Sequence, residues 1–127
     1  IEGKKCVTKT FRFYSNGVGL KSERLRIYGN EAAEIEELIA DKPELGGFLD
    51  PRLPYTRAEI IWICRNEMPR KLEDILARRT RAMFLDARAS SAIAPEVAEI
   101  MAREMKNDGK WTEAQVKDYN QLLLNYL

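Results

Sequence analysis

The feature that most constrains this chain is the apolar run Ile60–Cys64, which closely follows a helix-start signal. Thr56, with Glu59 three residues later, forms a capping box, in which two side chains bind the free N–H groups of a helix start. A buried strand also fits five apolar residues in a row. The capping box and the helix-forming flanks favour a helix over 56–68. Its apolar residues extend around more than one helical stripe, so we expect it to be covered on most sides.

Apolar residues at helical spacing predict further helices along the chain. Asn30 is the expected N-cap of one of them, and Pro95 suits the first turn of another. Thr112 and Gln115 resemble a second capping box. We expect Phe84, Leu85 and Tyr126 to join the core. The expected helical segments are 21–29, 31–42, 70–94, 95–108 and 113–127.

The N-terminal segment KKCVTKTFRFYSNG has a different character, because β-branched and aromatic residues are frequent in it and it stops at Asn16-Gly17. We interpret residues 1–20 as a strand-like arm or linker and residues 21–127 as a helical domain. The fold class is therefore mainly α, with about five helices and a short β-like arm. A single strand needs a sheet to pair with. Since the chain also does not begin with Met, we expect it to be part of a longer protein.

Composition excludes several functions. The 127 residues carry 21 basic and 20 acidic side chains, and this near balance argues against a nucleic-acid partner. Without histidine, the chain alone has no Ser-His-Asp or Cys-His catalysis. Cys6 and Cys64 fit two reduced thiols, as in a cytoplasmic protein. No run is long enough to span a membrane, and no signal peptide is evident. No dinucleotide or Walker loop is present, and NGVGL at 16–20 lacks the strand-turn-helix context of a phosphate loop. We therefore predict no catalytic, cofactor-binding or metal-binding residue.

An arginine-rich segment, ARRTRAMFLDAR, allows three interpretations. Its arginines could bind an anion or nucleic acid, or they could pair with the nearby Glu73, Asp74 and Asp86. The second interpretation is favoured, because mixed charges on helices more often form ion pairs. A domain interface is the third, since arginine and aromatic residues are enriched in interfaces. Glu67 is expected to be solvated or paired with an arginine rather than to be a buried acid.

The segment DPRLPYTRAEIIWICRNEMPRKLEDILARRTRAMFLDARA, residues 50–89, resembles the C-terminal domain of the FAD-dependent glycerol-3-phosphate dehydrogenases and the related α-glycerophosphate oxidases. The similar motifs are PRLPYT, the acidic-apolar-Trp helix, Glu67-Met68, LEDILARRTR and FLDARA. CVTK at 6–9 and IYGNEAAEI at 27–35 are also similar. The family commonly has His at Asn66 and a hydroxyl residue at Lys71, where a Thr would cap the following helix.

The resemblance implies a parent enzyme that oxidises sn-glycerol 3-phosphate to dihydroxyacetone phosphate through FAD, with quinone as the electron acceptor, or oxygen in the oxidases. It implies that this chain is a non-catalytic helical cap that binds no FAD itself and docks on its own N-terminal FAD and substrate domain. The parent would be cytoplasmic or peripheral at the inner face of the cell membrane, and a homodimer stays open. The candidate interdomain contacts are Arg52, Tyr55, Trp62, Arg65, Glu67, Arg78, Arg79 and Arg81.

Two readings of other classes remain open from the residues alone. A free-standing protein-interaction module would use helix 56–68 or the segment YNQLLLNYL as a ligand for a groove. A nucleic-acid binder would use Arg78, Arg79 and Arg81, with binding that weakens steeply as salt is added.

Overall fold

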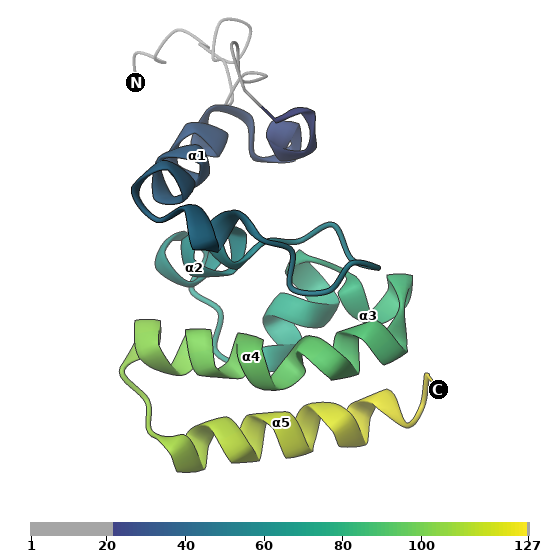
Figure 1. Ribbon diagram of the computed structural model, residues 1–127. Helices are drawn as coiled ribbons and strands as arrows, with labels where there is room; N and C mark the ends of the chain where they lie inside the picture. Colours follow the sequence, from purple (N-terminus) through teal and green to yellow (C-terminus); the bar gives the residue numbers. More distant parts are fainter. Residues whose placement is uncertain (1–21, 127) are drawn as a thin grey trace, which may run out of the picture.

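The computed structural model describes residues 22–126, and these form an assembly of helices (Figure 1). The mainly α fold class is confirmed, and the described residues contain no strand, only an isolated bridge between Phe48 and Thr56. The predicted strand-like arm at 1–20 lies outside the described residues. The elements are the 3₁₀ helices η1 (Glu23–Glu31) and η2 (Pro43–Gly46), the π-helix η3 (Asp74–Arg79), and the α-helices α1 (Ala32–Asp41), α2 (Arg57–Asn66), α3 (Ala82–Leu85), α4 (Ala87–Met105) and α5 (Gly109–Leu123).

Helix α2 forms the centre of the domain, as its apolar run predicts. It begins with the predicted capping box, in which the Thr56 side chain accepts from the Glu59 N–H and the Glu59 side chain accepts from the Thr56 N–H. Residues 58–63 are all buried. The helix packs against α1 on one side and α4 on the other, so it is covered on most sides, as expected.

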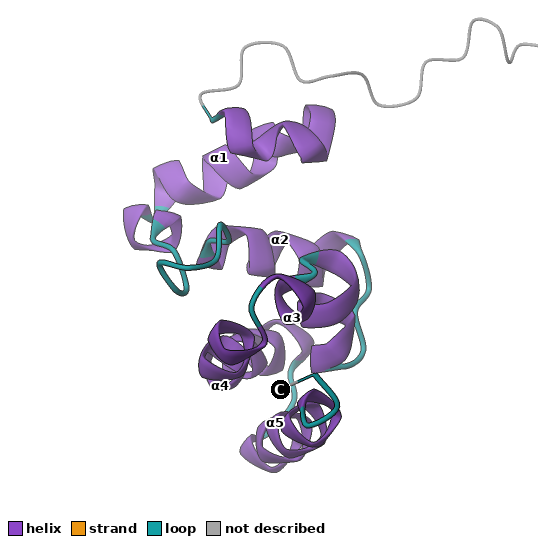
Figure 2. Ribbon diagram, turned by 90° about the vertical axis from the view of Figure 1, so that its right-hand side faces the viewer, coloured by secondary structure: helices purple, strands orange, loops and turns teal. Residues whose placement is uncertain are grey.

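The C-terminal half is an antiparallel pair, α4 and α5, that closes the domain on one side (Figures 1 and 2). The prediction of a helix start at Pro95 is wrong, because α4 begins at Ala87 and runs through Pro95. The Asp86 side chain starts this helix by accepting from the Ala89 N–H. An unbroken buried face from Ala89 to Ala102 offsets the hydrogen bond that proline cannot donate.

Two other predicted helix starts are also displaced. Asn30 does not cap α1, because η1 continues to Glu31, which precedes α1 and makes no side-chain cap. The second capping box is wrong as well: α5 begins at Gly109, and Asp108 caps it by accepting from the Trp111 N–H. The Gln115 side chain instead accepts from the backbone N–H of Leu72, which ties α5 to the segment before η3.

The predicted helix over 70–94 is broken into three pieces. A π-helix, η3, ends where the Thr80 N–H donates to the Ile75 carbonyl, and Arg81 then adopts a left-handed conformation with φ 57°. This reversal turns α3 so that Met83 is buried while Phe84 and Leu85 point outward. The expectation that Phe84, Leu85 and Tyr126 are core residues is wrong; all three are more than half exposed. The i,i+4 pair of Asp74 and Arg78 is present, at 3.7 Å.

Candidate functional site

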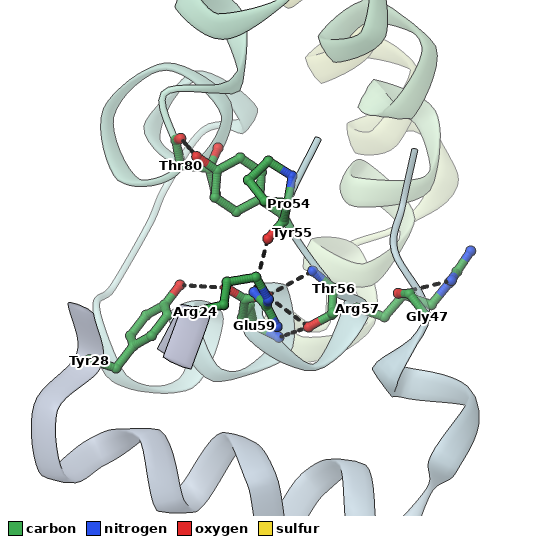
Figure 3. Close-up of polar contacts among 9 residues, drawn as sticks. All are labelled: Arg24, Tyr28, Gly47, Pro54, Tyr55, Thr56, Arg57, Glu59 and Thr80. Carbon is green, nitrogen blue, oxygen red and sulfur yellow. Dashed lines mark hydrogen bonds and ion pairs between the residues drawn. The ribbon is translucent and has the colours of Figure 1, made fainter. Parts of the chain in front are cut away.

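A buried carboxylate, Glu59, holds the N-terminal helices to the centre of the domain (Figure 3). Beyond capping α2, it accepts hydrogen bonds from the Thr56 hydroxyl at 2.8 Å and from the Tyr28 hydroxyl at 3.3 Å. The guanidinium of Arg24 forms an ion pair with the same carboxylate and donates to the Pro54 carbonyl at 2.9 Å. Thr56 and Arg24 bind one carboxylate oxygen of Glu59 and Tyr28 binds the other, so the carboxylate joins three segments of the chain and the cluster is structural.

Tyr28 and Trp62 extend this cluster toward α1. Their rings meet edge to face, with centroids 5.3 Å apart. The indole N–H of Trp62 donates to Glu34 at 2.8 Å, and only 3% of Trp62 is exposed. Burial, together with the adjacent Glu59 carboxylate, raises the pKa of the Tyr28 hydroxyl far above its ordinary value, so Tyr28 stays a neutral donor.

The eight candidate interdomain residues fall into two groups. Trp62 and Arg65 face α1 and α4, where Arg65 makes a two-pronged pair with Glu104 at 2.7 and 3.1 Å. The other six gather around η3 and α3. There the Tyr55 hydroxyl donates to the Thr80 carbonyl, as Figure 3 shows. The members of this second group are Arg52, Tyr55, Glu67, Arg78, Arg79 and Arg81.

Ion pairs within the domain engage most of these arginines, as the favoured interpretation of the arginine-rich segment expected. Arg78 pairs with Glu73 at 2.9 Å. Arg79 pairs with Glu67 at 2.5 Å and also donates to the Glu67 carbonyl, which confirms Glu67 as an arginine-paired residue.

Of the two other arginines near η3 and α3, Arg52 is ion-paired and Arg81 is not paired with any described residue. Arg52 binds Asp50 at 2.8 Å and lies 3.8 Å from Asp86. Asp50 keeps a pKa of about 2, because the Arg52 side chain and backbone N–H both bind it. Arg81 is exposed and has no ion pair with any described residue.

Residues that sequence reasoning missed act through contacts distant in the chain. Arg24, Tyr28 and Glu34 meet α2 across 28 to 35 positions, and no local pattern marks them. Asp74 accepts from the N–H groups of Arg70 and Lys71, just before the next helical segment. These N–H groups precede the helix, so the bonds do not replace the cap that a hydroxyl at position 71 would provide to the first helical turn.

The described residues contain no catalytic or metal-binding constellation. Between Ser22 and Tyr126, no three Cys, Asp or Glu side chains are placed to hold a metal ion. A cavity of about 640 Å³ is lined by apolar residues and by the paired Arg57–Glu96 and Arg65–Glu104. No helix within the same range is long and apolar enough to cross a bilayer. Burial raises the pKa of Cys64 to about 12, so the thiol is not activated as a nucleophile.

The described residues form a helical domain with a packed centre and many ion pairs on its surface. The family model for the C-terminal domain of alpha-glycerophosphate oxidase matches residues 8–116. The chain belongs to this family, and glycerol-3-phosphate dehydrogenases contain a similar domain. No solved structure matches the chain significantly.

Curated relatives agree with this assignment. The chain is 36% identical over 81 residues to glycerol-3-phosphate dehydrogenase SDP6, mitochondrial, of Arabidopsis thaliana, which covers 64% of the chain and 13% of that protein. It is 32% identical over 90 residues to a Synechocystis glycerol-3-phosphate dehydrogenase, covering 70% of the chain and 15% of the relative. The Bos taurus mitochondrial enzyme is 29% identical over 113 residues, which are 83% of the chain. The chain thus spans about a seventh of these relatives' length.

Proposed function

We propose that this chain is the non-catalytic helical cap of a longer FAD-dependent glycerol-3-phosphate dehydrogenase. The parent would oxidise sn-glycerol 3-phosphate to dihydroxyacetone phosphate and pass the electrons to quinone. The observation that carries the proposal is the family match over 8–116, combined with relatives of which the chain spans only 13–15%. The cap would contribute stability and docking, and its partner would be the N-terminal FAD and substrate domain.

The residues from 22 to 126 do not suit a flavin site. A flavin dinucleotide needs a glycine-rich turn at a helix N-terminus for its pyrophosphate. Helix α1 follows directly on η1, so its start is not preceded by a glycine-rich turn. The starts of α2, α4 and α5 are capped by the side chains of Thr56, Asp86 and Asp108. In this proposal the other domain binds the flavin, and no step of the reaction is given to a residue here.

The free-standing interaction module gains no support from the burial pattern. Helix α2 is covered on most sides and has no apolar face left for a groove. In the YNQLLLNYL segment, Tyr119 and Leu123 are buried against α4, which leaves Leu124 and Tyr126 exposed.

The first experiment is to sequence the coding DNA upstream of Ile1. We expect an open frame with a strand-GxGxxG-helix unit, followed by glycerol-3-phosphate-dependent dye reduction by the full-length protein. Reduction of a soluble quinone, rather than consumption of oxygen, would assign the enzyme to the dehydrogenases. A start codon immediately upstream of Ile1 would contradict the proposal, as would flavin bound to the separately purified 127-residue chain.

The location of the parent enzyme follows as part of the same proposal. We expect a cytoplasmic enzyme that is held peripherally at the inner face of the cell membrane. Fractionation should find it with membranes and release it with an alkaline wash. An enzyme that only detergent extracts would contradict this location.

A further inference from the structure

We infer that the surface formed by α3 and the turn after α5 is the face on which the remainder of the longer enzyme docks, and that the docked surface is apolar with carboxylates at its edge. This inference rests on the proposed function and adds to it the place of contact. The surface, termed the α3 face below, consists of Arg81, Phe84, Leu85, Arg88, Leu124 and Tyr126.

Exposed apolar side chains concentrate on this face. In the described part of the chain, Phe84, Leu85, Leu124 and Tyr126 are 55%, 62%, 64% and 51% exposed. The rings of Phe84 and Tyr126 meet edge to face at 5.7 Å, which joins α3 to the C-terminal turn. The other large exposed apolar residues lie on separate segments, and Arg24 covers one of them, Phe48. Clustered exposed apolar residues with a polar edge mark interaction sites.

The residues that flank α3 in the chain include two exposed arginines. Arg81 and Arg88 are both exposed, and neither forms an ion pair with any residue from 22 to 126. The neighbouring carboxylate of Asp86 is already engaged, because it caps α4 and lies near Arg52. Two uncompensated guanidinium groups beside an apolar patch complement carboxylates on the surface that covers them.

Arg81 is also held in a costly backbone conformation. Its φ of 57° lies in the left-handed region, which is unfavourable for a residue with a Cβ atom. The preceding residue is fixed on both sides, since the Tyr55 hydroxyl binds the Thr80 carbonyl and the Thr80 hydroxyl donates to the Ile75 carbonyl at 2.9 Å. Tyr55 and Thr80 thus hold the backbone before Arg81 in place, which lowers the backbone part of the cost of ordering this segment on binding.

The size and charge of the face favour a covalently linked partner. A stable dimer buries roughly 1,200–2,000 Å², far more than four half-exposed side chains offer. Anionic lipid is recruited by clusters of about four to eight basic residues, and this face has two free arginines. A domain in the same chain docks at high effective concentration and needs a smaller interface. The relatives supply such a domain, because about six-sevenths of their length lies outside the match.

The test is thiol labelling of the full-length enzyme. Phe84→Cys places a thiol on the α3 face, and Lys110→Cys places a matched thiol on the exposed start of α5, at the opposite end of that helix. Peptide mapping separates both from Cys6 and Cys64. The labelling rate of each cysteine in the folded enzyme is divided by its labelling rate in the same variant unfolded in urea, which corrects for the intrinsic reactivity of the thiol. We expect labelling at position 84 to be at least about tenfold slower than at position 110, because only a docked face requires an opening step.

Each outcome decides the inference. Equal labelling at both positions, in enzyme that reduces dye with glycerol 3-phosphate, would refute the docking face and leave the proposed function intact. An upstream sequence without a flavoprotein domain would refute both the proposed function and the docking face. Protection at position 84 that is lost on dilution would assign the face to a second copy. Protection that appears only with anionic phospholipid vesicles would assign it to a membrane. Either result would overturn the inference.

A second pair of variants tests the charge at the edge. Arg81→Gly relieves the backbone strain and removes the guanidinium. Arg70→Gly removes another exposed arginine that has no ion pair with any described residue and lies twelve positions before α3. In the Phe84→Cys background we expect Arg81→Gly to raise the labelling rate at position 84 by about threefold to tenfold, the effect of a lost interfacial ion pair. Arg70→Gly should leave that rate unchanged. No difference between the two would remove Arg81 from the interface.

Discussion

Arg24 and Glu59 lie 35 positions apart, yet the guanidinium of Arg24 binds directly to the Glu59 carboxylate, which is 1% exposed. The pair joins η1 to the first turn of α2, and Tyr28 adds a second donor from η1. A buried carboxylate with several hydrogen-bond donors is expensive to alter, because each partner left unpaired stays desolvated without compensation.

Glu59→Gln should therefore lower the free energy of unfolding by about 1.5–3 kcal/mol, the range for hydrogen bonds to charged groups. The amide keeps the size of the side chain but removes the charge that Arg24 requires. The matched control is Glu104→Gln, which alters the more exposed pair with Arg65 and should cost less than about 1 kcal/mol. Urea unfolding monitored by circular dichroism measures both. Equal losses would contradict a special role for the buried pair.

A second buried contact links α4 to α5, where the Ser90 hydroxyl and the Tyr119 hydroxyl lie 2.6 Å apart. Ser90→Ala and Tyr119→Phe should each destabilise the domain by about 1–2 kcal/mol, because each leaves one buried hydroxyl without its partner. The double variant should lose less than the sum, since no unpaired hydroxyl remains. A double-mutant cycle measures this coupling, and strictly additive losses would show that the two hydroxyls are not bonded.

Alkaline pH should lower the free energy of unfolding, first through the partly buried thiol of Cys64 and then through the tyrosines. Burial, with a smaller contribution from Glu104, raises the pKa of Cys64 from 9.0 to about 12. The folded state therefore binds this proton more tightly than the unfolded state. The resulting stability is complete below pH 9 and is lost as pH rises toward 12. The raised pKa values of Tyr28, Tyr55 and Tyr119 act in the same direction, from an ordinary value of 10.0.

Cys64→Ala tests this order. Between about pH 9 and pH 10 the thiol is the first of these groups to titrate in the unfolded chain. We expect the variant to lose less unfolding free energy over that interval than the unsubstituted chain does. Urea unfolding at several pH values provides the comparison, and identical slopes would show that the thiol is as acidic in the folded state as in the unfolded one.

Pro95→Ala should stabilise the domain. Proline lies nine positions into α4, exposed, where it cannot donate to the preceding turn. Alanine restores the N–H, and the gain should be about 1–3 kcal/mol, part of the difference between these residues in a helix interior. Thermal unfolding followed by circular dichroism measures it. A loss of stability would mean that α4 is adapted to a bend at this position.

Local signals predicted the parts of the fold that depend on neighbours in the chain. Thr56 and Glu59 define the start of α2 because a capping box is complete within four residues. Asn30, Pro95 and Thr112 carry equally good local signals that the structure does not use as helix starts. At those positions Asp86 and Asp108 begin the helices earlier, and η1 runs on past Asn30.

The candidate site was less accessible to sequence reasoning than the fold. The sequence predicts interdomain contacts at arginines, at two aromatic residues and at Glu67, and most of these side chains are engaged within the described domain. Phe84 and Leu85 were assigned to the core because a continuous helix was expected. The π-helix η3 and the left-handed Arg81 rotate α3 instead. A reversal of this kind depends on Tyr55, 25 positions before Thr80, which no periodicity contains.

The double use of Glu59 has a consequence for how the domain opens. The same carboxylate holds the first turn of α2 and anchors η1, so fraying at that helix end and release of residues 22–31 are one event. Amide hydrogen exchange should show these two segments losing protection together, with a common opening free energy, although they are separated in the chain. Residues 22–31 would then detach only when the first turn of α2 unwinds. A pulling force on the N-terminal side of the domain would therefore act directly on its central helix.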